Sequence, residues 1–184
     1  MYFTIVTYMK QVILFAVMLI LAGTVQAQNA TVTKVRQLYA DAKQEIAKRE
    51  QMKKDGVKPD DALVVTSDYM APGVGPTHEV IRYYHCSGYD ELLSTTFYRP
   101  FIMTRNYNVG AKEYYQEFLY DQTDDSNLVF FFQKSPDGEI RYYWGENGLA
   151  HQAVKGEGSI DDVFALRLAT DLREAFNRLM NREY

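Results

Sequence analysis

The chain has 184 residues, of which 47% are hydrophobic and 24% are charged, and its formal net charge is −4 at pH 7. This length is enough for one domain with a sizeable core, and the single cysteine, Cys86, excludes a disulfide within the chain. No basic patch is interleaved with aromatic residues, which argues against nucleic-acid binding.

The first 27 residues have the parts of a secretory signal peptide. A positive charge precedes an apolar run from Val12 to Ala22, and the small-residue pattern "VQA" then marks a cleavage site. The run is too short to span a bilayer as a helix, which needs roughly 20 apolar residues. We therefore expect cleavage before Gln28, a periplasmic or secreted location and no membrane span in the mature chain. Met1 and Met9 both remain candidate start residues, because a lysine directly follows Met9.

Two helices are predicted, one at each end of a single mature domain that covers 28–184. In the segment 29–54 the apolar residues recur at steps of three and four, namely Val32, Val35, Tyr39, Ala42 and Ile46. Ser159 and Asp162 form a start that resembles a capping box. The second helix then runs to the C-terminus with a predicted core face of Ile160, Phe164, Leu168, Leu172, Ala175 and Leu179.

Between the helices, short segments rich in β-branched and aromatic residues alternate with turn signals. We predict strands at Ala62–Tyr69, His78–Cys86, Thr95–Tyr107, Lys112–Asp121, Leu128–Lys134, Glu139–Trp144 and Leu149–Val154. Short connections such as "SPDG" and "GENG" favour hairpins between successive strands. The expected fold is therefore α+β: an N-terminal helix, an antiparallel meander of about six to seven strands, and a C-terminal helix packed on the sheet.

The stretch "APGVGPTHEVIRYYHC" contains a Gly-x-Gly and several candidate metal ligands. A strand pattern rather than a helix follows the glycines, and Pro76 lacks an N–H donor, so a turn is favoured over an anion site. On a strand, His85 points away from both His78 and Cys86, while His78 and Cys86 lie about 26 Å apart. We therefore predict no metal, no cofactor and no nucleophile–base couple here.

A hydrolase assembled from distant residues stays open as an alternative. It would combine His78, His85 or His151 with the acidic pairs Asp124–Asp125 and Asp161–Asp162. Each acidic pair has a simpler explanation, as a solvated loop and as a helix start. We assign no catalytic residue, because no nucleophile, base and orienting group are visible together.

Tyrosine doublets and one unbroken apolar run point to aromatic side chains on both faces of the sheet. In "NLVFFFQK" five apolar residues follow one another from Leu128 to Phe132. We expect the Leu128, Phe130 and Phe132 side to pack against the helices together with Tyr142 and Trp144. Phe131 would then lie on the other face, partly uncovered, beside Tyr115 and Tyr143. The candidate binding residues are Tyr83, His85, Tyr115, Phe131 and Tyr143.

The segments "VRQLYADAK", "MAPGVGP", "YNVGAKEYYQEFLYD" and "NLVFFF…EIRYYWGENGL" resemble small exported proteins of unknown function from Bacteroides-like bacteria. The resemblance covers most of the mature chain and implies a periplasmic or secreted location without catalytic residues to transfer.

The leading hypothesis is an exported, non-enzymatic domain that binds a protein, peptide or saccharide on an aromatic sheet face. A small periplasmic hydrolase and a structural envelope component are the alternatives, and a homodimer is left open.

Overall fold

The computed structural model describes residues 30–59, 62–92, 94–123, 126–157 and 160–181. Within these ranges the chain forms an N-terminal helix (30–54), a set of strands and the C-terminal helix α2 (Asp162–Met180). The strands are β1 (Leu63–Ala71), β2 (Gly75–Asp90), β3 (Thr95–Val109), β4 (Lys112–Tyr120), β5 (Leu128–Ser135), β6 (Gly138–Gly145) and β7 (Gly148–Gly156). The predicted α+β order is confirmed, and each predicted strand overlaps an observed one.

In the described part of the chain, the strands form one seven-stranded antiparallel sheet in the order β1-β2-β3-β4-β5-β6-β7. This is the predicted meander, because each short turn returns the chain beside the strand it has just left. In the first turn Gly73 and Gly75 have φ angles of +74° and +102°, which favour glycine. The Gly-x-Gly is therefore part of a hairpin turn, as predicted.

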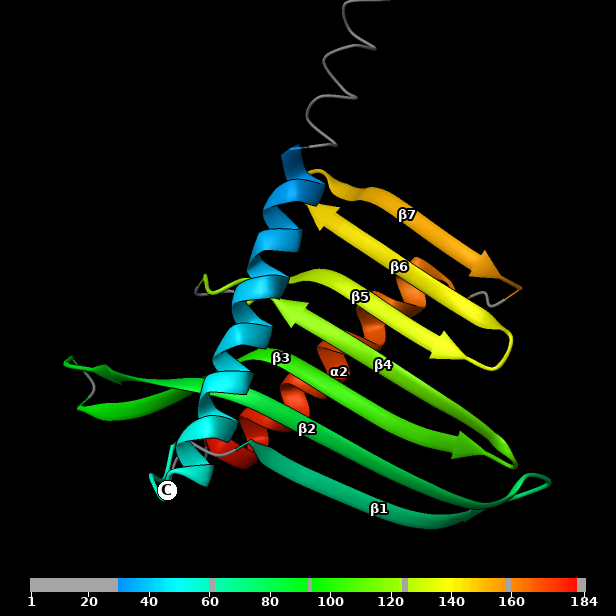
Figure 1. The fold of residues 1–184 in the computed structure, drawn as a ribbon, viewed down its shortest axis with the longest axis horizontal. Coiled ribbons are helices and arrows are strands. Elements are labelled where there is room, and N and C mark those ends of the chain that lie inside the picture. The colour runs from blue at the N-terminus through cyan, green and yellow to red at the C-terminus, as the bar shows by residue number, and fades with distance from the viewer. Residues whose placement is uncertain (1–29, 60–61, 93, 124–125, 158–159, 182–184) are drawn as a thin grey trace, which may run out of the picture.

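The two helices lie on opposite faces of the sheet, so the domain has three layers (Figure 1). The N-terminal helix covers one face through Val35 and Ala42, which pack with Phe101, Ile102, Leu119, Phe130 and Tyr143. On the other face α2 covers a larger core that includes Tyr83, Met103, Phe118, Phe131, Tyr142 and Trp144. Apolar side chains on both faces of the central strands are thus buried, each set by a different helix.

The predicted face assignment for β5 is correct for Leu128, which lies in the same core as Tyr142 and Trp144, and wrong for Phe130, Phe131 and Phe132. Phe131 pairs with Tyr142 and Phe130 pairs with Tyr143, and residues directly opposite in an antiparallel pair share a face. Phe131 and Tyr142 therefore lie under α2, whereas Phe130 and Tyr143 lie under the N-terminal helix. The second apolar face does need a cover, as its composition indicated, and the N-terminal helix provides it.

The predicted core face of α2 is correct in part: Leu172 is buried, and Ile160 and Leu168 pack against the core. The buried residues of α2 are Ala165, Ala169, Leu172 and Phe176, whereas Phe164 and Leu179 are exposed. Two alanines at the contact let the helix axis approach the sheet closely, and the Tyr120 hydroxyl donates a hydrogen bond to the Ala169 carbonyl oxygen at 2.8 Å. The observed N-cap is Asp161, which accepts a hydrogen bond from the Val163 N–H; the predicted cap Ser159 lies outside the described residues.

Candidate functional site

The structure places the five predicted binding residues on two different faces of the sheet. Tyr83, His85 and Phe131 lie on the α2 side, and Tyr115 and Tyr143 lie on the side of the N-terminal helix. All except Tyr115 are at most 5% exposed. The expected exposure of Phe131 and Tyr143 was therefore wrong, and these five side chains do not form one surface.

On the α2 side, Phe176 of the helix is the common neighbour of two predicted residues. Its ring centroid lies 5.5 Å from that of Tyr83 and 5.7 Å from that of His85. Burial raises the pKa of Tyr83 to about 12. Phe131 packs on Phe118 in the same core, with ring centroids 5.1 Å apart. These contacts are those of an aromatic core that anchors the helix.

On the opposite side, Tyr115 belongs to a cluster around Glu117. The Glu117 carboxylate is buried on β4 and accepts hydrogen bonds from the hydroxyls of Tyr39 and Tyr115 and from the Lys43 ammonium. Lys43 also forms an ion pair with this carboxylate. We refer to Tyr39, Lys43, Tyr115 and Glu117 as the Glu117 cluster; it joins the N-terminal helix to the sheet.

The chemistry of the Glu117 cluster favours structure over catalysis. Burial, hydrogen bonding to Glu117 and its negative charge together hold the pKa values of Tyr39 and Tyr115 far above the ordinary value for tyrosine. A phenol with a raised pKa is a poor acid at neutral pH, and the Glu117 carboxylate already accepts hydrogen bonds from three donors. The cluster satisfies a buried charge and fixes the docking position of the helix.

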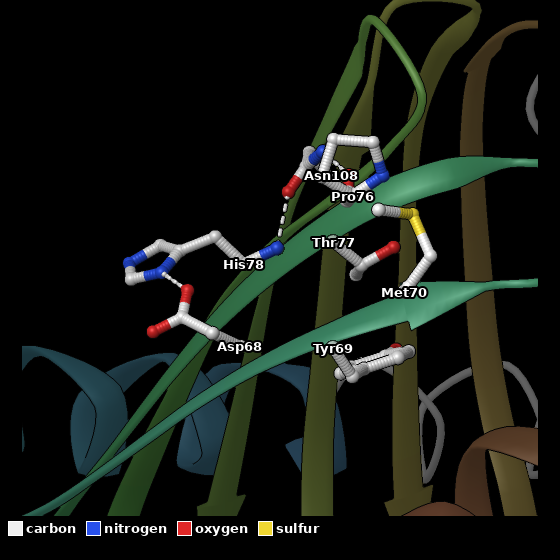
Figure 2. Close-up of a pocket in the computed structure, with 7 residues that line it drawn as sticks. All are labelled: Asp68, Tyr69, Met70, Pro76, Thr77, His78 and Asn108. Carbon is white, nitrogen blue, oxygen red and sulfur yellow. Dashed lines mark hydrogen bonds and ion pairs between the residues drawn. The ribbon is translucent and has the colours of Figure 1, made fainter.

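A shallow depression of about 440 Å³ lies at the hairpin end of β1 and β2, where Figure 2 shows its lining side chains. The Asp68 carboxylate faces the His78 ring, with Oδ1 and Nδ1 2.7 Å apart. Asn108 of β3 fastens the hairpin: its Oδ1 accepts from the His78 backbone N–H at 2.6 Å. Its Nδ2 donates to the carbonyl oxygens of Pro76 and Gly110, each at 3.0 Å.

The Asp68–His78 pair has two of the three groups that a hydrolase of the serine type needs. The missing group is a nucleophile: the adjacent Thr77 is buried and, by strand alternation, points to the opposite face. Among the described residues no group of three or more His, Cys, Asp or Glu side chains is placed to hold a metal ion. The hydrolase alternative thus stays a prediction that this geometry does not favour.

An aromatic surface does occur near the hairpin ends of the α2 face, on residues the sequence reasoning did not select. Tyr107 and Tyr114 are stacked, with ring centroids 5.0 Å apart and an interplanar angle of 10°. The Arg105 guanidinium lies 4.2 Å from the centroid of Tyr107 and forms an ion pair with Glu79. Tyr69 of β1 is on the same face and is half exposed. We call Tyr69, Tyr107 and Tyr114, with Arg105 and Glu79, the tyrosine surface.

A polar ladder links the tyrosine surface to the centre of the sheet. Arg105 donates to the Gln116 side chain at 3.1 Å, and Gln116 donates to the Gln133 side chain at 2.7 Å. Gln116 and Gln133 are both buried, so these bonds satisfy amides that would otherwise be costly in the interior. These hydrogen bonds fix the position of the Arg105 guanidinium and therefore also that of the Tyr107 ring against which it lies.

Two of these features could have been found from the sequence. Asp68 and His78 are equidistant from Gly73, so a hairpin centred on that glycine pairs them directly, as observed. Likewise the predicted turn at "NVG" brings Tyr107 and Tyr114 onto neighbouring strands, although their direct pairing follows from a turn centred between Gly110 and Ala111. Without the positions of the helices, however, an exposed tyrosine cannot be told from a buried one.

No protein-family model matches the chain, and no curated protein or solved structure is significantly similar to it. The resemblance to exported proteins of Bacteroides-like bacteria therefore stays a prediction. Neither helix in the described ranges has the combination of length and apolar composition that a membrane crossing requires.

Proposed function

We propose that the protein is an exported, non-enzymatic domain that binds a neutral saccharide on the tyrosine surface. The observation that supports this most is the stacked pair of Tyr107 and Tyr114, near hairpin ends that extend beyond both helices (Figure 1). A tyrosine ring offers a flat apolar face and a polar hydroxyl, which suits the apolar faces and hydroxyl rim of a sugar ring. Because Tyr107 lies between Arg105 and Tyr114, we expect the sugar to contact the outer face of Tyr114 and the half-exposed Tyr69, with Tyr107 supporting Tyr114.

The charges around this surface favour a neutral ligand over a charged one. Arg105 is paired with Glu79, and Lys112 is paired with Asp137 at 2.9 Å. Asp68 is bonded to His78 at the neighbouring depression. Because each of these charges already has a partner, an anionic glycan or a basic peptide that used one of them would have to displace an existing interaction, whereas a neutral ligand would not.

Interactions within the domain hold Arg105 and Tyr107 of the tyrosine surface in place without a ligand. Arg105 lies against the face of Tyr107 and donates hydrogen bonds to the side chains of Glu79 and Gln116. Fixed side chains lose little conformational entropy on binding, which favours affinity on a shallow surface.

Calorimetric titration of the mature protein with neutral oligosaccharides, uronic-acid oligosaccharides and short peptides tests the proposal. We expect binding of a neutral oligosaccharide that Tyr107→Ala and Tyr114→Ala each weaken at least about tenfold, or ~1.4 kcal/mol. Tyr89→Ala is the matched control, since Tyr89 is exposed on the β2–β3 hairpin. Binding of peptides alone, or saccharide binding that neither substitution weakens, would contradict the proposal.

A further inference from the structure

Strand β1 forms one edge of the sheet, and Figure 1 shows no element along its outer side. It pairs with β2 over nine consecutive residues without a register shift. Such an edge presents unpaired backbone N–H and C=O groups, which proteins usually protect with lysine, proline, a bulge or a cover. The other edge strand, β7, has a register shift in its pairing with β6 and carries Lys155.

The sequence of β1, "LVVTSDYMA", contains none of these protective residues. Its one charged side chain, Asp68, is bonded to His78 of β2. Three large apolar side chains of β1 are strongly exposed: Val64 (50%), Tyr69 (50%) and Met70 (72%). An unprotected edge strand with exposed apolar residues indicates that this edge pairs with a strand of another chain.

We propose that β1 pairs antiparallel with β1 of a second copy of this chain, around a twofold axis at Ser67. This register places Val64 opposite Met70 of the second copy and Val65 opposite Tyr69. The remaining pairs are Leu63 with Ala71, Thr66 with Asp68, and Ser67 with itself. Members of each pair differ by an even number of residues, so they lie on the same face and their side chains touch.

The neighbouring registers are less favourable. Centring the axis on Asp68 puts two carboxylates directly opposite one another, which is destabilising. Centring it on Thr66 puts Asp68 opposite the apolar Val64. The register centred on Ser67 pairs all nine residues of β1. It covers Val64 and Met70, which are exposed on the face of the sheet that carries the N-terminal helix. It also places Asp68 opposite the hydroxyl of Thr66.

The result is one continuous sheet built from two copies, with a seam about 30 Å long at 3.4 Å per residue. Because the axis is normal to the sheet, both tyrosine surfaces lie on the same face of the joined sheet. The inference does not depend on the proposed saccharide function: it rests on the edge, the exposed residues and the register alone.

Cysteine crosslinking tests the axis, with the native thiol removed by Cys86→Ser. Opposite Cα atoms of an antiparallel pair are about 4.5–5.5 Å apart, within disulfide range, so Ser67→Cys should give a disulfide-linked dimer on mild oxidation. Thr66→Cys is the matched control, because its two copies would be about 8 Å apart across the same axis. Equal crosslinking at the two positions, or none at position 67, would overturn the proposal.

Charge substitutions test the register in the otherwise native chain. Sedimentation velocity over a wide concentration range should show a monomer–dimer equilibrium for the wild type. The variant Val64→Lys/Met70→Lys places like charges opposite each other and should weaken the dimer at least about tenfold. The variant Val64→Lys/Met70→Glu restores complementary pairs and should associate again. Melting temperatures equal to that of the wild type would show that both variants fold. A wild type that stays monomeric, or a dimer that neither variant weakens, would refute the proposal.

Discussion

Lys43 of the N-terminal helix and Glu117 of β4 form an ion pair in which the carboxylate is buried and the ammonium is partly exposed. The hydroxyls of Tyr39 and Tyr115 complete the shell of donors around the carboxylate. A buried charge is tolerated only when it is paired and hydrogen-bonded, so this arrangement links the position of the helix to the identity of one residue in the sheet. The apolar contacts hold the helix on the sheet, and the Glu117 cluster fixes where it docks.

Replacing Glu117 should therefore destabilise the protein far more than replacing an exposed carboxylate. Glu117→Ala leaves two partly buried hydroxyls without their acceptor, at an expected cost of about 2–4 kcal/mol in the free energy of unfolding. Glu113→Ala, at an exposed position on the same strand, should change this free energy by less than about 0.5 kcal/mol. Urea denaturation of both variants measures the difference; equal effects would show that the cluster contributes little.

Stability should fall as the pH rises above about 10. The folded state holds the pKa values of Tyr39 and Tyr115 above the ordinary tyrosine value, through burial and the neighbouring Glu117. Unfolded tyrosines lose their protons near pH 10, so above that pH the unfolded state binds fewer protons than the folded state, and unfolding becomes easier. Below pH 10 both states are protonated and this contribution to stability is fully present.

Denaturation at a series of alkaline pH values, with phenolate absorbance recorded in parallel, checks this linkage. In the variant Tyr39→Phe/Tyr115→Phe the decline in stability with pH should be shallower than in the wild type. It should not vanish, because burial also raises the pKa of Tyr83, to about 12, and that residue remains. Identical pH profiles for variant and wild type would mean that the two phenols titrate normally in the folded protein.

Phe131 provides a direct test of which face is core. Its side chain is fully buried under α2 and packs against Phe118 and Tyr142. Phe131→Ser should destabilise the protein by at least about 3–5 kcal/mol, because it leaves a cavity and buries a hydroxyl. Tyr89→Ser, at an exposed aromatic position, should leave the melting temperature nearly unchanged. A mild effect of Phe131→Ser would indicate that α2 does not cover this position in solution.

The meander was predictable because its signals are local. Turn residues such as those in "NVG" and "SPDG" lie between strand patterns, and each turn sets the pairing of the strands beside it. Asp68 and His78 follow from the same rule, since they flank one turn symmetrically. Short-range chemistry therefore determines both the order of the strands and several cross-strand pairs.

The positions of the helices were not predictable in this way, because they depend on contacts distant in sequence. Tyr39 and Glu117 are 78 residues apart, and nothing in either segment identifies the other. Register shifts add a further obstacle: the one between Leu119 and Tyr120 interrupts the alternation of faces on which the assignment of β5 relied. On α2 the buried face includes two alanines, Ala165 and Ala169. A rule that assigns the largest apolar residues to the core predicts a neighbouring face of the helix instead.

Processing of the N-terminus gives the last prediction. We expect cleavage before Gln28, two residues ahead of the described start of the N-terminal helix at residue 30. Val35 is the first buried residue of that helix, so cleavage there leaves every contact of the helix with the sheet intact. Intact-mass spectrometry of protein recovered from a bacterial periplasm should show a chain that begins at Gln28, with the melting temperature of a chain expressed from that residue. A mature species that retains Val12 to Ala22 would contradict export through signal cleavage.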